Sequence, residues 1–168
     1  MKYSGPLGKN AIIPYSSAPD GFPRYWIYLS ALGITLPTSS ATITSSGQEL
    51  AVILDSGSTL SYLPTAVVTS LLGYFTGVIS RGSGLYSVPC SYLTAVGSID
   101  FTFGNTYIHV PFSQFIWFNV YLPLCQNLSK MRLLMLTSFK GVTCYFGAIA
   151  TSSVDVILGG SLFCIQHN

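Results

Sequence analysis

The fold of this 168-residue chain is decided by residues 51–59, which read AVILDSGST. Four apolar residues, two of them β-branched, predict a buried strand, and the SGS tripeptide after Asp55 predicts a tight turn. An Asp at the end of a buried strand is costly unless hydrogen bonds satisfy its carboxylate. The backbone N–H of Gly57 and the hydroxyl of Ser58 are available for those bonds. The alternative interpretation is an Asx-type turn that closes a hairpin and has no chemical role.

Around this stretch the chain consists of short segments rich in Ile, Val, Thr, Tyr and Phe, separated by Gly, Pro and Ser. This pattern is typical of an all-β fold. Hairpin turns are predicted at Ser46-Gly47 and at Gly104-Asn105. Strands are predicted at Ala11–Ile13, Tyr25–Ile34, Ala41–Thr44, Leu50–Leu54, Tyr86–Val88, Ile99–Phe103, Tyr107–Val110, Thr143–Ala150 and Val156–Leu158.

Local patterns add more detail to this outline. Alternation over residues 99–103 is expected to bury Ile99, Phe101 and Phe103 on one face. One short helix is predicted over residues 64–72, with Thr65 as a possible cap and with Val68, Leu71 and Leu72 on one side.

Composition excludes several classes of function. Only 7% of the residues are charged and the net charge is +2, so no field that would attract nucleic acid is expected. No apolar run reaches the length of a membrane span. Solubility must come largely from uncharged polar groups, including 23 serines and 14 threonines. His109 and His167 have no acidic or Cys neighbours at ligand spacing, so neither a metal site nor a cofactor is predicted.

A second apolar strand ends in a glycine about a hundred residues later, at Val156-Ile157-Leu158-Gly159. The strand into Asp-Ser-Gly-Ser, the helix beginning near Pro64 and this late Ile-Leu-Gly, in that order, resemble the C-terminal lobe of pepsin-like aspartic proteases, most of all the fungal yapsin-like branch. The resemblance implies one lobe of a bilobal β-barrel fold, with a short helix after the catalytic loop. It therefore predicts a single domain over residues 1–168, in which 119–141 is an insertion foreign to the family.

The resemblance also implies roles for individual residues. Asp55 matches the family's second catalytic aspartate, and the hydroxyls of Ser56 and Ser58 match groups that support the catalytic pair. Ile53, Gly57, Ser58 and Thr59 match positions that bind substrate. Cys90 and Cys144 match the two halves of the family's disulfide, which leaves Cys125 and Cys164 without an assigned role; if the chain stays in the cytosol, buried thiols are the better interpretation of all four.

The activity that the resemblance implies is hydrolysis of peptide bonds in a peptide or protein substrate, in a secreted, cell-wall or vacuolar setting. That chemistry needs two carboxylates sharing one proton, and this sequence contains only one Asp-Ser/Thr-Gly turn. Inactivity as a monomer is therefore expected, with activity restored by a second lobe or by a homodimer that supplies Asp55 twice. Two alternatives remain: a non-catalytic β-rich peptide-binding module, and a truncated pseudoenzyme or gene-model fragment lacking the first lobe and the family's last strands.

Overall fold

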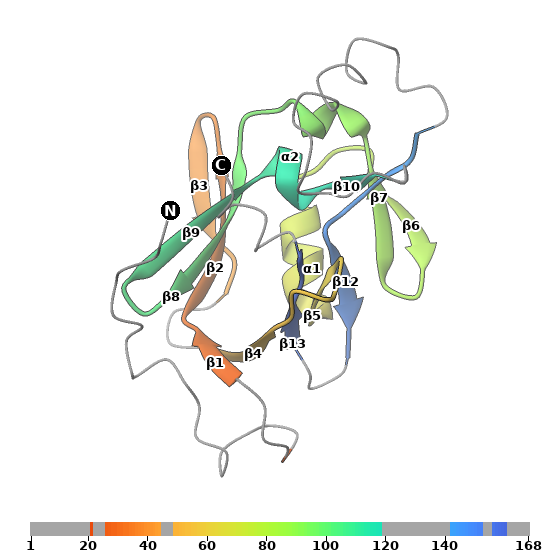
Figure 1. Ribbon diagram of the computed structural model, residues 1–168. Coiled ribbons are helices and arrows are strands. Elements are labelled where there is room, and N and C mark those ends of the chain that lie inside the picture. Colours follow the sequence, from red (N-terminus) through yellow and green to blue (C-terminus); the bar gives the residue numbers. More distant parts are fainter. Residues whose placement is uncertain (1–20, 22–25, 45–48, 119–141, 153–155, 161–168) are drawn as a thin grey trace.

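The computed structural model describes residues 21, 26–44, 49–118, 142–152 and 156–160, which form three β-sheets and a few short helices (Figure 1). The all-β prediction is confirmed, and over these residues the sheets do not close into one barrel. The predictions for Ala11–Ile13, the Ser46-Gly47 turn and residues 119–141 lie outside the described residues.

The five-stranded sheet carries the stretch that decides the fold. Its central strands run in mixed directions, because β13 pairs parallel with β4 and antiparallel with β5. Val52 on β4 and Leu158 on β13 are fully buried. In spatial order the sheet contains β1 (Trp26–Leu29), β4 (Leu50–Leu54), β13 (Val156–Leu158), β5 (Ser61–Pro64) and β12 (Ala148–Thr151).

In one four-stranded sheet, the two neighbouring strands on either side of Gly104-Asn105 form the predicted hairpin. Gly104 has a φ of +57°, a conformation that suits glycine. Ile99 and Phe101 are buried as expected, and Phe103 is partly buried. In spatial order this sheet contains β3 (Ser39–Thr42), β2 (Ala31–Leu36), β8 (Ser98–Phe103) and β9 (Thr106–Pro111).

The other four-stranded sheet is joined to a neighbouring 3-10 helix by the disulfide Cys90–Cys144, with an S–S distance of 2.07 Å. The bond joins the short 3-10 helix η2 (Cys90–Leu93) to β11, and it confirms the predicted pairing. In spatial order the sheet contains β10 (Trp117–Phe118), β11 (Cys144–Tyr145), β7 (Leu85–Val88) and β6 (Ile79–Gly82).

Helix α1 (Thr65–Leu72) lies between the two four-stranded sheets in Figure 1. Val68, Leu71 and Leu72 are buried on one side of it, as predicted. The predicted cap is wrong. Pro64 occupies the N-cap position without a side-chain bond, while the Thr65 hydroxyl donates to the carbonyl of Thr151 on β12 at 3.3 Å. A second short helix, α2 (Phe112–Phe115), was not predicted and buries both of its phenylalanines.

Two predicted strands are each divided in the structure, because the chain crosses from one sheet to another. The strand predicted over residues 25–34 breaks at Ser30, whose N–H donates to Thr102 of β8 at 2.7 Å. The strand predicted over residues 143–150 breaks at Phe146 and Gly147. A Cβ on Gly147 would lie only 2.0 Å from the carbonyl oxygen of Phe115, so this crossing requires glycine.

The crossings bring aromatic rings together in the core. Phe75 packs against Tyr92, Phe112 and Phe146 with centroid distances of 4.8, 5.2 and 5.4 Å. Phe146 and Phe115 pack edge to face at 5.0 Å. Such offset and edge-on arrangements are the favoured ones for aromatic pairs. Phe75, Phe112, Phe115 and Phe146 are all buried, so these rings form part of the core.

Candidate active site

Asp55 follows the last residue of β4 and lies beside the end of β13. Its backbone N–H donates to the carbonyl of Leu158 at 3.0 Å, which continues the parallel pairing of the two strands. The two motifs that carry the family resemblance, the Asp-Ser-Gly-Ser turn and the Ile-Leu-Gly segment, therefore meet in the fold. Two apolar strands, of which β4 buries only Val52 and β13 buries Val156 and Leu158, thus bring a carboxylate to their common end, where its side chain is partly exposed.

The carboxylate of Asp55 accepts the two hydrogen bonds that the sequence predicts. The Gly57 N–H donates to Oδ1 at 2.9 Å, and the Ser58 hydroxyl donates to Oδ2 at 2.5 Å. The Ser58 hydroxyl, followed by the Gly57 N–H, lowers the pKa of Asp55 below its ordinary value, because both bonds favour the charged form. Each oxygen is held by a different donor, so the carboxylate is oriented as well as ionised.

The loop that carries Asp55 is bonded to the two residues that follow β13. The Gly160 N–H donates to the carbonyl of Ser58 at 2.5 Å, and the Gly159 N–H donates to the hydroxyl of Ser61 at 3.1 Å. A Cβ on Gly159 would lie 2.4 Å from the carbonyl oxygen of Leu60. The glycine that ends the predicted Ile-Leu-Gly signal is thus required by a close backbone approach.

The other predicted site residues lie around this carboxylate. Ser56, Gly57 and Thr59 are exposed on the loop, and Ser58 is partly buried beneath it. Ile53 lies two residues before Asp55, is half-buried, and pairs with Ile157 of β13 in the sheet. The predicted catalytic and substrate-binding residues lie close together in the sequence, and the structure directs the Ser58 hydroxyl at Asp55.

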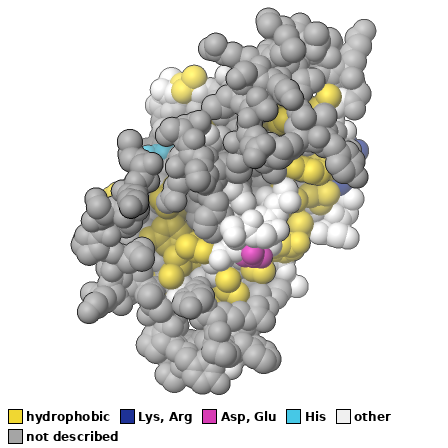
Figure 2. Space-filling model, in the orientation of Figure 1, with side chains coloured by type: hydrophobic (Ala, Val, Ile, Leu, Met, Phe, Trp, Pro, Cys, Tyr) yellow, Lys and Arg dark blue, Asp and Glu magenta, His cyan; other side chains and the backbone are white. Residues whose placement is uncertain are grey.

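Apolar side chains are exposed beside this segment. Leu54 is 38% exposed and Tyr62, at the start of the neighbouring strand β5, is 37% exposed. On the face drawn in Figure 2, hydrophobic side chains gather around a small acidic patch.

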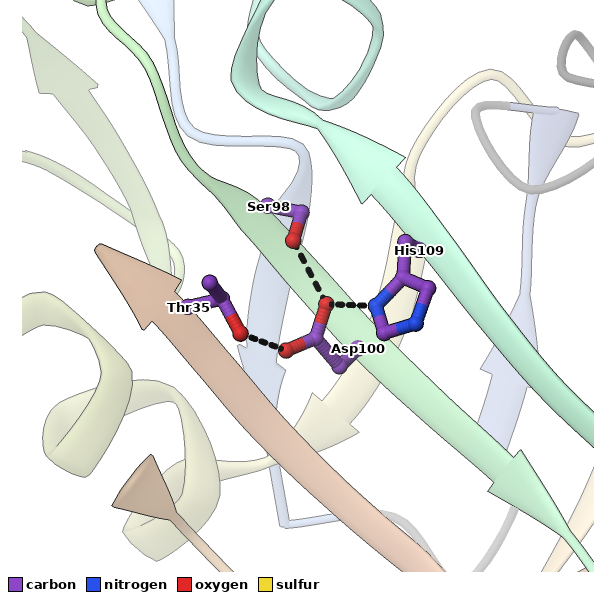
Figure 3. Close-up of polar contacts among 4 residues, drawn as sticks. All are labelled: Thr35, Ser98, Asp100 and His109. Carbon is purple, nitrogen blue, oxygen red and sulfur yellow. Dashed lines mark hydrogen bonds and ion pairs between the residues drawn. The ribbon is translucent and has the colours of Figure 1, made fainter. Parts of the chain in front are cut away.

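A second polar centre was missed by the sequence analysis. Asp100 of β8 accepts bonds from the hydroxyls of Thr35 and Ser98, both at 2.6 Å, and its Oδ1 lies 2.7 Å from His109 Nδ1 (Figure 3). The contact between Asp100 and His109 was missed because the two residues are nine positions apart, which is not a spacing expected for a shared site. The predicted turn at Gly104-Asn105 could have shown it, because a two-residue hairpin there places Asp100 opposite His109.

The sequence predicts neither a metal site nor a membrane-spanning helix, and two findings on the described residues concern these features. Among the described residues there is no group of three or more His, Cys, Asp or Glu side chains arranged to hold a metal ion. In that same part of the chain no helix is long and apolar enough to cross a membrane.

Comparison with known proteins decides the family. The model of the family described as eukaryotic aspartyl protease matches residues 8–127, which include the loop of Asp55 and β4, the strand that leads into it. The chain belongs to this aspartyl protease family. Its members among the curated proteins include aspartic proteinase yapsin-3 of Saccharomyces cerevisiae, which is 35% identical over 83 residues, or 49% of this chain and 16% of that protein.

Two other aspartyl proteases extend the comparison. Aspartic proteinase 3 of Saccharomyces cerevisiae is 30% identical over 164 residues, or 95% of this chain and 25% of that protein. The aspartic proteinase from Irpex lacteus shares the fold, with a TM-score of 0.55 and 19% identity over 90% of this chain and 40% of that structure. The chain therefore spans about a quarter or less of the curated relatives it matches.

Proposed function

We propose that this chain is the C-terminal lobe of an aspartic endopeptidase, in which Asp55 is the second of two catalytic carboxylates. One observation carries the proposal. The Asp55 carboxylate stands at the common end of β4 and β13, with Gly57 N–H on one oxygen and the Ser58 hydroxyl on the other. The fungal relatives named above carry proteinase names, which supports the same conclusion.

The mechanism requires a second carboxylate close to Asp55. Two carboxylates about 3 Å apart cannot both ionise, so they share one proton. The ionised group removes a proton from water, and the protonated group donates to the oxygen of the scissile carbonyl. The pair titrates as a unit. Asp55 alone has its pKa lowered and is therefore suited to the ionised role until a partner carboxylate approaches.

The partner has to approach from the exposed side of the loop. Ser56 is exposed there, and it is proposed to hydrogen-bond the equivalent loop of a second lobe or of a second copy of this chain. The exposed side chains of Leu54 and Tyr62 offer apolar contact beside it. Because one carboxylate cannot act as both acid and base, the chain is proposed to be inactive as a monomer.

Substrate is proposed to bind along the same loop. Gly57 and Thr59 are exposed and Ser58 is partly exposed, so an extended peptide is proposed to lie along the backbone of these three residues. Ile53 is half-buried on β4 and is proposed to line a pocket for a substrate side chain. Residues 1–168 are proposed to make one lobe, with residues 119–141 as an insertion.

A non-catalytic peptide-binding module is the second candidate. It is favoured by one observation: no second Asp-Ser/Thr-Gly turn occurs in this sequence to supply the other catalytic carboxylate. Such a module would keep the surface of Gly57, Ser58 and Thr59 for binding and would have no turnover.

The deciding experiment is cleavage of an unstructured protein near pH 4, measured over a range of chain concentrations, with and without pepstatin. The homodimer predicts activity that rises with the square of the concentration at low concentration, is blocked by pepstatin and is lost in Asp55→Asn. Addition of a separately produced first lobe tests the other partner. Binding of peptide without cleavage under all these conditions, unchanged in Asp55→Asn, would establish the non-catalytic module instead.

A further inference from the structure

Ser61, the first residue of β5, has a buried hydroxyl with a defined partner. The residue is only 1% exposed, and its Oγ accepts a hydrogen bond from the Gly159 N–H at 3.1 Å. Its own N–H donates to the carbonyl of Gly147 at 3.0 Å. Ser61 therefore joins the segment that follows β13 to the segment that precedes β12, directly beneath the loop of Asp55.

The bond between Ser61 and Gly159 is one of three between the 55–61 loop and residues 158–160. The other two run from Asp55 N–H to the Leu158 carbonyl and from Gly160 N–H to the Ser58 carbonyl. Those two use backbone atoms alone, so a change of side chain can leave them intact. The bond at Gly159 needs a hydroxyl at position 61, which makes Ser61 the side-chain determinant among the three contacts.

Gly159 has little freedom to find another partner. A Cβ on this residue would lie 2.4 Å from the carbonyl oxygen of Leu60 and 2.8 Å from that of Ser58, so the backbone is pressed against the loop. Both members of the hydrogen bond are buried. Removing the hydroxyl would leave a buried N–H unsatisfied, and the two segments would have to move apart to hydrate it.

Movement at Gly159 would reach Asp55 through Ser58. The Ser58 carbonyl is bonded to Gly160, and its hydroxyl is bonded to the Asp55 carboxylate at 2.5 Å. We propose that Ser61 is a positioning residue. Its bond to Gly159 fixes the position of the 55–61 loop against residues 158–160 and so keeps the Ser58 hydroxyl on Asp55. Ser61 contacts no reacting atom. The inference rests on the proposed role of Asp55 for its functional meaning.

The test measures the titration of Asp55 in the full chain by ¹³C NMR of the carboxyl carbon, with Asp55→Asn to assign the signal. Ser61→Ala removes the hydroxyl, and Ser61→Thr keeps it. Ser87→Ala is the matched control, because Ser87 is a similarly buried serine, 4% exposed, that bonds Arg81 instead. We expect the pKa of Asp55 to rise in Ser61→Ala and to stay as in the parent chain in Ser61→Thr and Ser87→Ala.

An unchanged pKa of Asp55 in a folded Ser61→Ala variant would overturn the proposal. Folding is checked by Asp100, whose pKa is lowered only while β2, β8 and β9 are assembled. If Ser61→Ala does not fold, Gly160→Ala decides, since its new Cβ would lie 3.2 Å from the Ser58 carbonyl oxygen and press on the Gly160–Ser58 contact through which Ser61 is proposed to act. A raised pKa of Asp55 there supports the positioning route, and an unchanged one rejects it.

This result is independent of peptidase activity. A chain that never cleaves a peptide still gives the Asp55 titration. A raised pKa in Ser61→Ala together with no cleavage under any condition would leave the role of Ser61 in place and reject the proposed function. Conversely, cleavage that is abolished by Asp55→Asn, together with an Asp55 pKa that is unchanged in Ser61→Ala, would support the proposed function and reject the role of Ser61.

Discussion

Asp100 and His109 face each other across β8 and β9, with Asp100 Oδ1 and His109 Nδ1 2.7 Å apart. An ionised carboxylate can only accept hydrogen bonds, so Nδ1 carries the proton in this pair. The Asp100 side chain is 19% exposed and that of His109 is 65% exposed. With Thr35 on β2 donating to the other carboxylate oxygen, Asp100 links three neighbouring strands of one sheet (Figure 3).

This arrangement predicts how stability depends on pH. Burial raises the pKa of Asp100, but hydrogen bonds from Ser98, Thr35 and His109 outweigh it and hold the pKa below the ordinary value. A pKa that is lower in the folded state means that the stabilisation is complete above the unfolded value of about 3.9 and is lost as pH falls through the folded value. The free energy of unfolding of the parent chain should therefore exceed that of Asp100→Asn above about pH 5, and the gap should close in more acidic solution. Urea titrations of both proteins at several pH values measure this, and a gap that does not depend on pH contradicts it.

The contribution of His109 is smaller and can be measured separately. Directly opposed cross-strand pairs contribute about 0.2–1 kcal/mol, so His109→Ala should lower the free energy of unfolding by about that amount at pH 7. Tyr107→Ala, at an equally exposed position on the same strand, is the control for loss of strand propensity. Equal losses in the two variants would show that the contact with Asp100 contributes nothing.

The disulfide between Cys90 and Cys144 should be a major source of stability. The two residues are 54 positions apart, and closing a loop of that length restricts the unfolded chain by about 4 kcal/mol in the chain-entropy model. Reductant should therefore lower the melting temperature of the parent chain markedly. The double variant Cys90→Ala/Cys144→Ala should melt at the lower temperature with or without reductant. A reductant effect that persists in the double variant would show that another cysteine is responsible.

Gly159 should be intolerant of any side chain. Because an added Cβ would lie 2.4 Å from a backbone oxygen, Gly159→Ala should destabilise the fold by about 3 kcal/mol, the upper part of the range for overpacked sites. Gly73→Ala is the matched control. Gly73 has helical φ and ψ at the end of α1 and its nearest neighbour would be 3.3 Å away, so this change should be neutral or stabilising by about 0.5 kcal/mol. Thermal melts of the two variants compare them directly, and similar losses would contradict the close approach.

Some elements of the fold can be read from the sequence because the local and the tertiary signals agree. Residues 50–54 and 156–158 are apolar runs that end in turn residues, and the structure gives β4 and β13 those same bounds. Strand β6 was missed because its four residues, ISRG, are exposed at a sheet edge and carry no alternation. Strand β5 was missed because it ends in Pro64, a residue that usually excludes a strand.

In the site, too, contacts within a contiguous motif could be predicted, and contacts between distant residues such as Ser61 and Gly159 could not. The loop from Asp55 to Thr59 is a contiguous motif, so its internal bonds could be predicted from spacing. The contact of Ser61 with Gly159 joins residues 98 positions apart and is specified only by the way β13 crosses beside β5. The Asp100–His109 pair needed the hairpin register as well as the residue types. The contacts that sequence reasoning did not reach therefore depend on strand register or on side chains that meet where strands lie side by side, and they belong to no motif.

Ser58 offers the most direct test of how the loop controls its carboxylate. Its hydroxyl is the largest cause of the lowered pKa of Asp55, so Ser58→Ala should raise that pKa toward the ordinary value, whereas Ser58→Thr should preserve it. Because the Asp55 pKa is lower in the folded state, the parent chain loses this contribution to stability as pH falls, and the loss should be smaller in Ser58→Ala. Ser56→Ala is the control, since Ser56 is exposed and does not contribute to the lowered pKa. Carboxyl ¹³C titrations of the three variants measure the shifts, and an equal rise in Ser56→Ala would mean that the whole turn, rather than the Ser58 hydroxyl, holds Asp55 ionised.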